Sequence, residues 1–147
     1  MTAATLLLGI GMGGFLDGIV LHQILQWHNM LSAVRPPQTM QAMQLNMTAD
    51  GWFHLAMWLV TAAGVLLLRA TPGPPDAWPW AFAGNLFIGW GAFNVVEGLI
   101  DHHLLELHHV RDVPTHMPAY DFAFLALGGV GFLILGVALR RKRVVAA

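Results

Sequence analysis

Two acid–histidine pairs with the same spacing are the part of this chain best suited to chemistry. Asp17 precedes His22 by five positions, and Glu97 precedes His102 by the same interval. Carboxylates and neutral imidazoles together form ligand sets for zinc, copper and iron, and a bound cation would cancel the carboxylate charge. A further imidazole lies in the next apolar stretch. The sequence therefore predicts a metal site whose histidines are the primary ligands and whose acids complete the shell: His22, His54, His102, Asp17 and Glu97.

Five further residues are predicted to support this site or to act as alternative ligands. They lie at one end of the same apolar stretches or just beyond it: Asp50, Asp101, Asp121, His28 and His108. Asp50 and Asp121 equally suit helix N-caps, because acidic side chains are favoured at a helix N-terminus. A dinuclear centre like that of the di-iron carboxylate proteins is an alternative, although the chain lacks their Glu-x-x-His pairing.

The five-residue spacing poses a geometric problem in an α-helix. Five residues turn an ideal helix by about 500°, so the two side chains point about 140° apart. We expect either a site lying off-axis between helices, or a kink or π-bulge at Gly18 and Gly98. Alternatively, each acid holds a histidine from a neighbouring helix.

The composition indicates that these polar residues lie in a membrane protein. The 147 residues suffice for one domain, and 56% of them are apolar. Charged residues make up only 10%, against about 25% in a typical soluble domain. So small a chain cannot bury that much apolar surface in water. The absence of cysteine excludes disulfides, thiolate metal sites and iron–sulfur clusters. A net charge of −1 argues against a nucleic-acid partner.

Four apolar stretches approach the roughly 20 residues that a transmembrane helix needs: 5–27, 52–68, 80–100 and 122–139. Most of the basic residues fall on one side of these spans: Arg69, Arg140, Arg141, Lys142 and Arg143. Only Arg35 and Arg111 fall on the other side. The positive-inside rule then predicts that both termini are cytoplasmic and that the histidine-rich loops lie outside. The predicted metal site would lie in the outer half of the lipid bilayer.

The chain contains an internal repeat. The segment DGIVLHQILQWH (17–28) aligns without gaps with EGLIDHHLLELH (97–108). Asp50 precedes Arg69 by 19 residues, and Asp121 precedes Arg140 by the same number. We therefore expect a single membrane domain (1–147) made of two tandem two-helix repeats, 1–70 and 80–142. The predicted fold is an all-α bundle of four transmembrane helices, with pseudo-two-fold symmetry about the membrane normal.

Three strings in the chain resemble a known family: GGFLDGIVLHQILQWH, MTADGWFH and FNVVEGLIDHHLLELHHVR. The family comprises small bacterial four-span membrane proteins and is catalogued as a numbered domain of unknown function. The resemblance implies a four-helix fold in the bacterial inner membrane, with respiratory or oxidase-assembly proteins as partners. It carries no established activity.

The residues favour a metal-binding membrane protein that handles the ion or uses it in redox chemistry. One alternative is a b-type haem protein with His22 and His102 as axial ligands. Others are a cation or proton channel, and a structural or assembly subunit of a respiratory complex. Whether the chain is a metal-dependent oxidoreductase stays open, because no substrate pocket or electron route can be identified in the sequence. Whether it forms a homo-oligomer stays open too.

Overall fold

The computed structural model describes residues 2–71 and 78–142, and within those ranges the chain is helical and contains no strand. The helices run in chain order as α1 (Thr2–Leu16) continued by the π-helix η1 (Asp17–Ile24), α2 (Met40–Ala70), α3 (Trp78–Glu97) continued by the π-helix η3 (Gly98–Leu104), and α4 (Pro118–Ala123), π-helix η4 (Phe124–Gly131) and α5 (Phe132–Arg141) joined end to end. The all-α prediction is confirmed. The proline-rich link at 72–77 and Arg143 lie outside the described residues.

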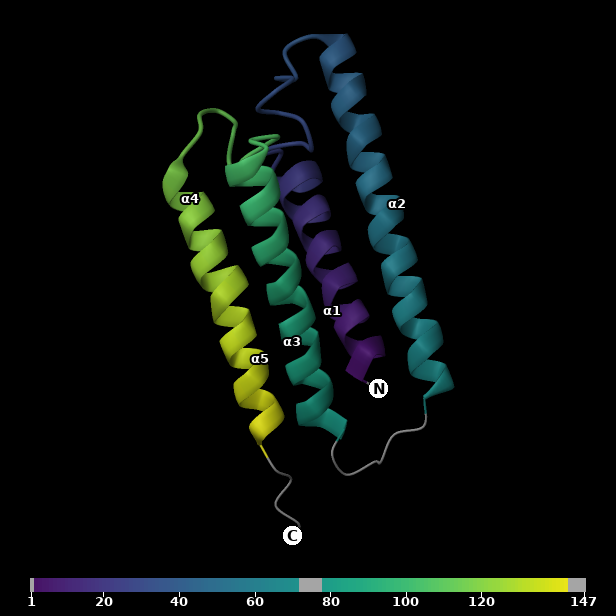
Figure 1. Cartoon of the computed structure of the whole chain (residues 1–147). Helices are drawn as coiled ribbons and strands as arrows, with labels where there is room; N and C mark the ends of the chain where they lie inside the picture. The colour runs from purple at the N-terminus through teal and green to yellow at the C-terminus, as the bar shows by residue number, and fades with distance from the viewer. Residues whose placement is uncertain (1, 72–77, 143–147) are drawn as a thin grey trace.

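Helices α1 and α3 form the central pair, with α2 packed on α1 and α5 packed on α3 (Figure 1). Glycines allow the central pair to approach closely. A Cβ added at Gly9 would collide with the carbonyl oxygen of Leu86, and one at Gly89 would collide with that of Leu6. Small residues bring membrane helices into backbone contact in this way, because lipid gives no hydrophobic force that would hold them together.

The beginning of α1 and the end of α5 lie at the same end of the helices (Figure 1). At the opposite end, which we term the loop end, the segments 25–39 and 105–117 meet (Figure 1). Backbone hydrogen bonds tie these two loops together, since Ala33 N–H donates to Leu107 O and Val113 N–H donates to Trp27 O. The loop end is therefore one packed structure built from both halves of the chain.

Within the described residues, three helices are long and apolar enough to cross a membrane: Thr2–Ile24, Met40–Ala70 and Pro118–Arg141. Large apolar side chains cover their outer faces, including Leu66 and Leu127, which are 67% and 71% exposed. Such a surface suits lipid rather than water. The predicted span 80–100 falls within α3 and η3, which are not among these three helices. Polar residues interrupt the apolar sequence of this span, including Asn85 and Asn94, whose side chains are buried.

Two helices begin furthest from their predicted starts. Helix α2 begins at Met40, well before the predicted start at residue 52. The Thr39 side chain caps it by accepting a hydrogen bond from Ala42 N–H at 3.2 Å, which satisfies a free donor of the first turn. The fourth helix begins at Pro118 rather than residue 122, because proline is well tolerated in the first turn of a helix.

Candidate metal centre

Two π-helices resolve the spacing problem of the acid–histidine pairs. Hydrogen bonds in a π-helix join residues five apart, so positions i and i+5 lie one turn apart on one face. In η1, His22 Nε2 lies 3.1 Å from Asp17 Oδ2. Across the start of η3, His102 Nε2 lies 2.8 Å from Glu97 Oε1. Of the predicted solutions, the π-bulge beside Gly18 and Gly98 is the one that the structure adopts.

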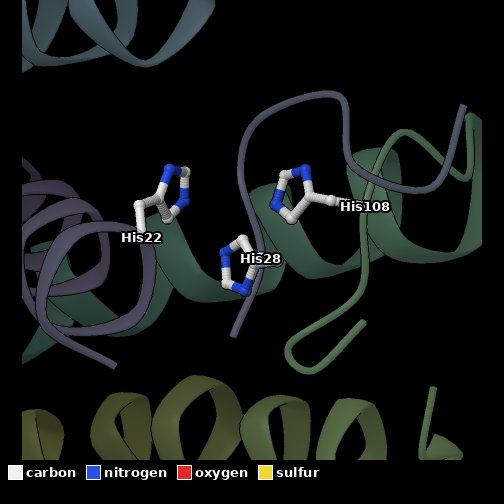
Figure 2. A group of neighbouring side chains, drawn as sticks. All are labelled: His22, His28 and His108. Carbon is white, nitrogen blue, oxygen red and sulfur yellow. The ribbon is translucent and has the colours of Figure 1, made fainter. Parts of the chain in front are cut away.

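Four histidine rings form one buried cluster between the two halves of the chain. Each of His22, His28, His102 and His108 is only 1% exposed. The rings of His28 and His108 stack with centroids 4.6 Å apart. His22 lies 4.3 Å from His28, and His102 lies 5.0 Å from His108, by the same measure. Figure 2 shows three of these rings converging, two from the first half and His108 from the second.

His28 and His108 are each oriented by the opposite half of the chain. His28 Nδ1 donates to the carbonyl oxygen of Val110 at 2.9 Å, and His108 Nδ1 donates to that of Met30 at 3.2 Å. A carbonyl oxygen only accepts, so the hydrogen must be on Nδ1 in both rings. A neutral ring then presents its lone pair at Nε2, the form that binds metals.

Carboxylates orient the other two histidines at the same ring nitrogen. His22 Nδ1 lies 3.0 Å from Asp50 Oδ1, and His102 Nδ1 lies 3.4 Å from Asp121 Oδ1. Asp50 lies well inside α2, so it is not the N-cap of that helix. Asp121 lies in the first turn of α4. Both carboxylates also accept a backbone N–H at 2.8 Å, from Met30 and Val110 respectively.

The Nε2 atoms of all four rings face the two interior carboxylates. Asp17 Oδ2 lies 4.0 Å from His28 Nε2, in addition to its contact with His22. Glu97 Oε1 lies 2.9 Å from His108 Nε2, in addition to its contact with His102. Within the described residues, His28 Nε2 is buried without a hydrogen-bond partner, as are the second oxygens of Asp17 and Glu97. These atoms retain free lone pairs.

His28 lies beyond the end of η1, and its surroundings keep the ring uncharged. Burial holds its pKa well below the usual 6.5, and the neighbouring His108 and His22 lower it further. A histidine that is neutral at physiological pH can act as a ligand without first losing a proton.

Within the part of the chain that the structure describes, neither His54 nor Asp101 belongs to a group of three or more side chains whose ligand atoms lie within 4.8 Å of one another. His54 Nε2 packs against the backbone of Gly18, with the rings of Phe15 and Phe53 at 6.4 and 5.8 Å. Asp101 is half-buried and lines a cavity of about 310 Å³ together with Glu97 and apolar side chains. The structure brings together the remaining predicted residues.

Two groups of side chains in the cluster have ligand atoms that all lie within 4.8 Å of one another. They are His22, His28 and His108, and Glu97, His102 and His108. His28 and His108, which the sequence predicts as supporting residues, lie at the centre of the cluster. The repeat contained the signal, because both histidines recur at equivalent positions.

The helices and the buried cluster together define a helical membrane protein with a histidine–carboxylate group able to hold a metal ion. The chain belongs to the family DUF2243, described as a predicted membrane protein, whose sequence model matches residues 4–143. This confirms the family resemblance. No curated protein and no solved structure matches the chain.

Proposed function

We propose that the protein is a membrane metal-binding protein that holds a transition-metal ion in the histidine cluster. The ligands would be the Nε2 atoms of the four buried histidines, completed by one or both interior carboxylates: His22, His28, His102, His108, Asp17 and Glu97. One observation carries this proposal. The Nδ1 atoms of His22, His28 and His108 are each held by an acceptor outside the cluster, and every Nε2 atom faces its interior. His102 Nδ1 lies 3.4 Å from Asp121 Oδ1 without a hydrogen bond, on the same side of its ring. Metal-ligating histidines are oriented in this way, with the second ring nitrogen held by a carboxylate or a backbone carbonyl.

Electrostatics supports a cation at this position. Asp17 and Glu97 are each 6% exposed and lie in helices with apolar surroundings. An acidic residue near the centre of a membrane costs about 2.5–3.5 kcal/mol on insertion scales. A metal ion would neutralise both carboxylates while taking the lone pairs of neutral imidazoles.

Each half of the chain supplies two imidazoles and one carboxylate. A 2-His-1-carboxylate set is typical of mononuclear non-haem iron sites, and mixed nitrogen–oxygen sets also suit zinc and copper. Two such sets lie side by side, because His28 and His108 are stacked. This arrangement supports a dinuclear centre as one form of the site, used for metal handling or for metal-dependent redox chemistry.

We further infer that the chain crosses the membrane four times, with both termini in the cytoplasm of a bacterium and the cluster in the outer half of the inner membrane. Helix α3 lies between α1 and α5. Its buried polar residues are therefore shielded from lipid, and it can span without being uniformly apolar. The basic residues at 140–142 close the last helix at the end opposite the loops, as the positive-inside rule requires of a cytoplasmic end.

Contacts that recur with an 80-residue offset support a pseudo-two-fold axis along the membrane normal. Gln26 and Glu106 both adopt positive φ, of 51° and 48°. Leu25 N–H donates to Val20 O, and Leu105 N–H donates to Ile100 O, in both cases at 2.8 Å. Matching local structure in two segments of different sequence is typical of duplicated units.

The haem alternative has weaker support. The His28 and His108 rings each lie within 6.4 Å of both His22 and His102. A porphyrin between His22 and His102 would have to displace both rings from the hydrogen bonds that orient them.

Elemental analysis with a visible spectrum tests the proposal. We expect purified wild-type protein, reconstituted with Zn²⁺, Cu²⁺ or Fe²⁺ in turn, to retain stoichiometric metal in the buried cluster. The variant His28→Gln/His108→Gln should lose that metal. His103→Gln, which changes an exposed histidine outside the cluster, should retain it. Thermal unfolding in detergent would check that each variant is folded.

Two results would overturn the proposal. One is wild-type protein that retains none of these metals, which would favour a structural or assembly subunit. The other is a Soret band in the purified protein, which would favour haem.

A further inference from the structure

The loop end carries a second group of imidazoles and a carboxylate outside the buried cluster. His109, Asp112 and His116 have ligand atoms that all lie within 4.8 Å of one another. All three belong to the loop between η3 and α4. Their equivalents in the first repeat, 80 positions earlier, are Asn29, Ser32 and Pro36. The second repeat therefore has histidine and aspartate side chains at positions where the first repeat has neither.

Neighbouring groups hold the side chains of this outer group, His109, Asp112 and His116, in place. The rings of His109 and His116 lie 3.9 Å apart. Asp112 Oδ2 accepts hydrogen bonds from Ser32 Oγ at 2.6 Å and from the backbone N–H of His109 at 3.3 Å. The carboxylate is thus fixed by the first half of the chain while it faces two imidazoles of the second.

A cavity of about 610 Å³ adjoins this cluster. All three side chains line it, together with Ser32 and a proline-containing part of the first loop. His109 and Asp112 are half-buried, and His116 is exposed. An ion from the aqueous phase can therefore reach these residues, whereas the buried histidines are almost completely covered.

We propose that His109, Asp112 and His116 form a second, solvent-accessible metal site for a divalent transition-metal ion. Two imidazoles and one carboxylate supply three ligands, and the cavity leaves the remaining coordination position to water. Asp121 supports this assignment, because its Oδ2 lies 3.2 Å from His109 Nδ1 and would hold that ring nitrogen while Nε2 binds the ion, as carboxylates do for metal-ligating histidines.

A single carboxylate joins this site to the buried cluster. Asp121 Oδ2 lies 3.2 Å from His109 Nδ1, and Asp121 Oδ1 lies 3.4 Å from His102 Nδ1. In the first half, the amide of Asn29 occupies the corresponding place and donates to Asp50 at 2.7 Å. The outer site is therefore an entrance through which ions approach the buried centre from one side. This role as an entrance, unlike the outer site itself, rests on the proposed function.

A titration of the detergent-solubilised protein with Co²⁺, followed by its visible absorption, tests the outer site. We expect His116→Gln to weaken one class of sites by about tenfold or more, since even a residue that only orients a ligand contributes about 10–100-fold. His109→Gln/His116→Gln should abolish that class. His103→Gln, an exposed histidine of η3 outside both groups, should bind as wild type does.

The outcomes separate the two proposals. If both outer variants bind Co²⁺ with wild-type affinity and stoichiometry, the outer site is wrong. If wild type binds only the class that the outer variants remove, the outer site stands and the buried centre fails. Because His116 is exposed, its single variant should stay folded, and it decides the question if the double variant does not fold.

Discussion

Replacing Asp50 by asparagine separates orientation of a ligand from ligation itself. Asp50 contacts His22 at Nδ1, the nitrogen that faces away from the proposed metal. The asparagine oxygen can still accept from His22 and from the backbone of Met30. The nearby Asn29 amide can turn to accept from the new NH₂ group. The change therefore removes the negative charge that supports the imidazole while it preserves the shape of the site.

The size of the effect follows from the kind of hydrogen bond that is lost. A bond to a charged partner contributes about 1.5–3 kcal/mol, against about 0.5–1.5 kcal/mol for a neutral one. The difference of about 1–1.5 kcal/mol corresponds to a decrease in metal affinity of roughly tenfold. The equivalent change, Asp121→Asn, should have a smaller effect through His102, because that contact is longer, at 3.4 Å against 3.0 Å.

Competition between the protein and a chromophoric chelator for Zn²⁺ would measure these affinities. Glu106→Gln is the control, because it removes one negative charge from an exposed position at the same end of the molecule. Equal affinities for wild type and Asp50→Asn, with both proteins folded, would refute the view that Asp50 supports a metal ligand. An equal loss in Glu106→Gln would attribute the effect to overall charge.

Three further predictions concern helix packing, the pH dependence of stability and the role of His54. Gly9→Ala should lower the thermal unfolding temperature, because its Cβ would meet the backbone of Leu86. Gly51→Ala is the control, because an added Cβ there has no atom within 4 Å, and it should raise the stability of α2 by about 0.5–1 kcal/mol. In metal-free protein, the stability of wild type relative to His28→Gln should fall on acidification below pH 6.5, because the buried ring stays neutral while the unfolded chain takes up a proton. The slope is about 1.4 kcal/mol per pH unit until the pKa of the folded state is reached. Parallel curves of unfolding free energy against pH for the two proteins would contradict this. His54→Leu introduces the residue type found at the equivalent position of the second repeat, Leu125. It should leave the metal content measured by elemental analysis unchanged, and a loss of metal would show that His54 is a ligand.

Much of the architecture could be predicted from the sequence, because the main requirement for a helix in lipid is a long run of apolar residues, and such runs are visible in the sequence. Long apolar runs gave the helices, and the identical spacing in the two halves gave six of the residues that meet at the cluster. The start of α2 was missed because residues 40–49 are mixed in polarity. Their helical structure depends on the Thr39 cap and on continuity with the apolar part of the helix.

The arrangement of the site was harder to predict. The π-helical turn was one of three solutions that the spacing allowed, and an unbroken α-helix would have separated Asp17 from His22. His28 and His108 lie beyond the ends of the π-helices, where the sequence predicts supporting residues rather than the centre of a site. Their burial depends on the two loops packing across the repeat boundary. His54 has ligand chemistry and helical periodicity in its favour, but the close approach of η1 and α2 at Gly18 directs its ring towards aromatic neighbours.

Anomalous diffraction from crystals of the metal-loaded protein would test the central claim most directly. The account predicts a metal peak inside the four-histidine cluster, about 2.0–2.1 Å from Nε2 atoms if the ion is zinc, with Asp17 or Glu97 completing its coordination. A metal coordinated by the Nδ1 atoms of these four rings, or fully loaded crystals with no peak inside the cluster, would contradict it.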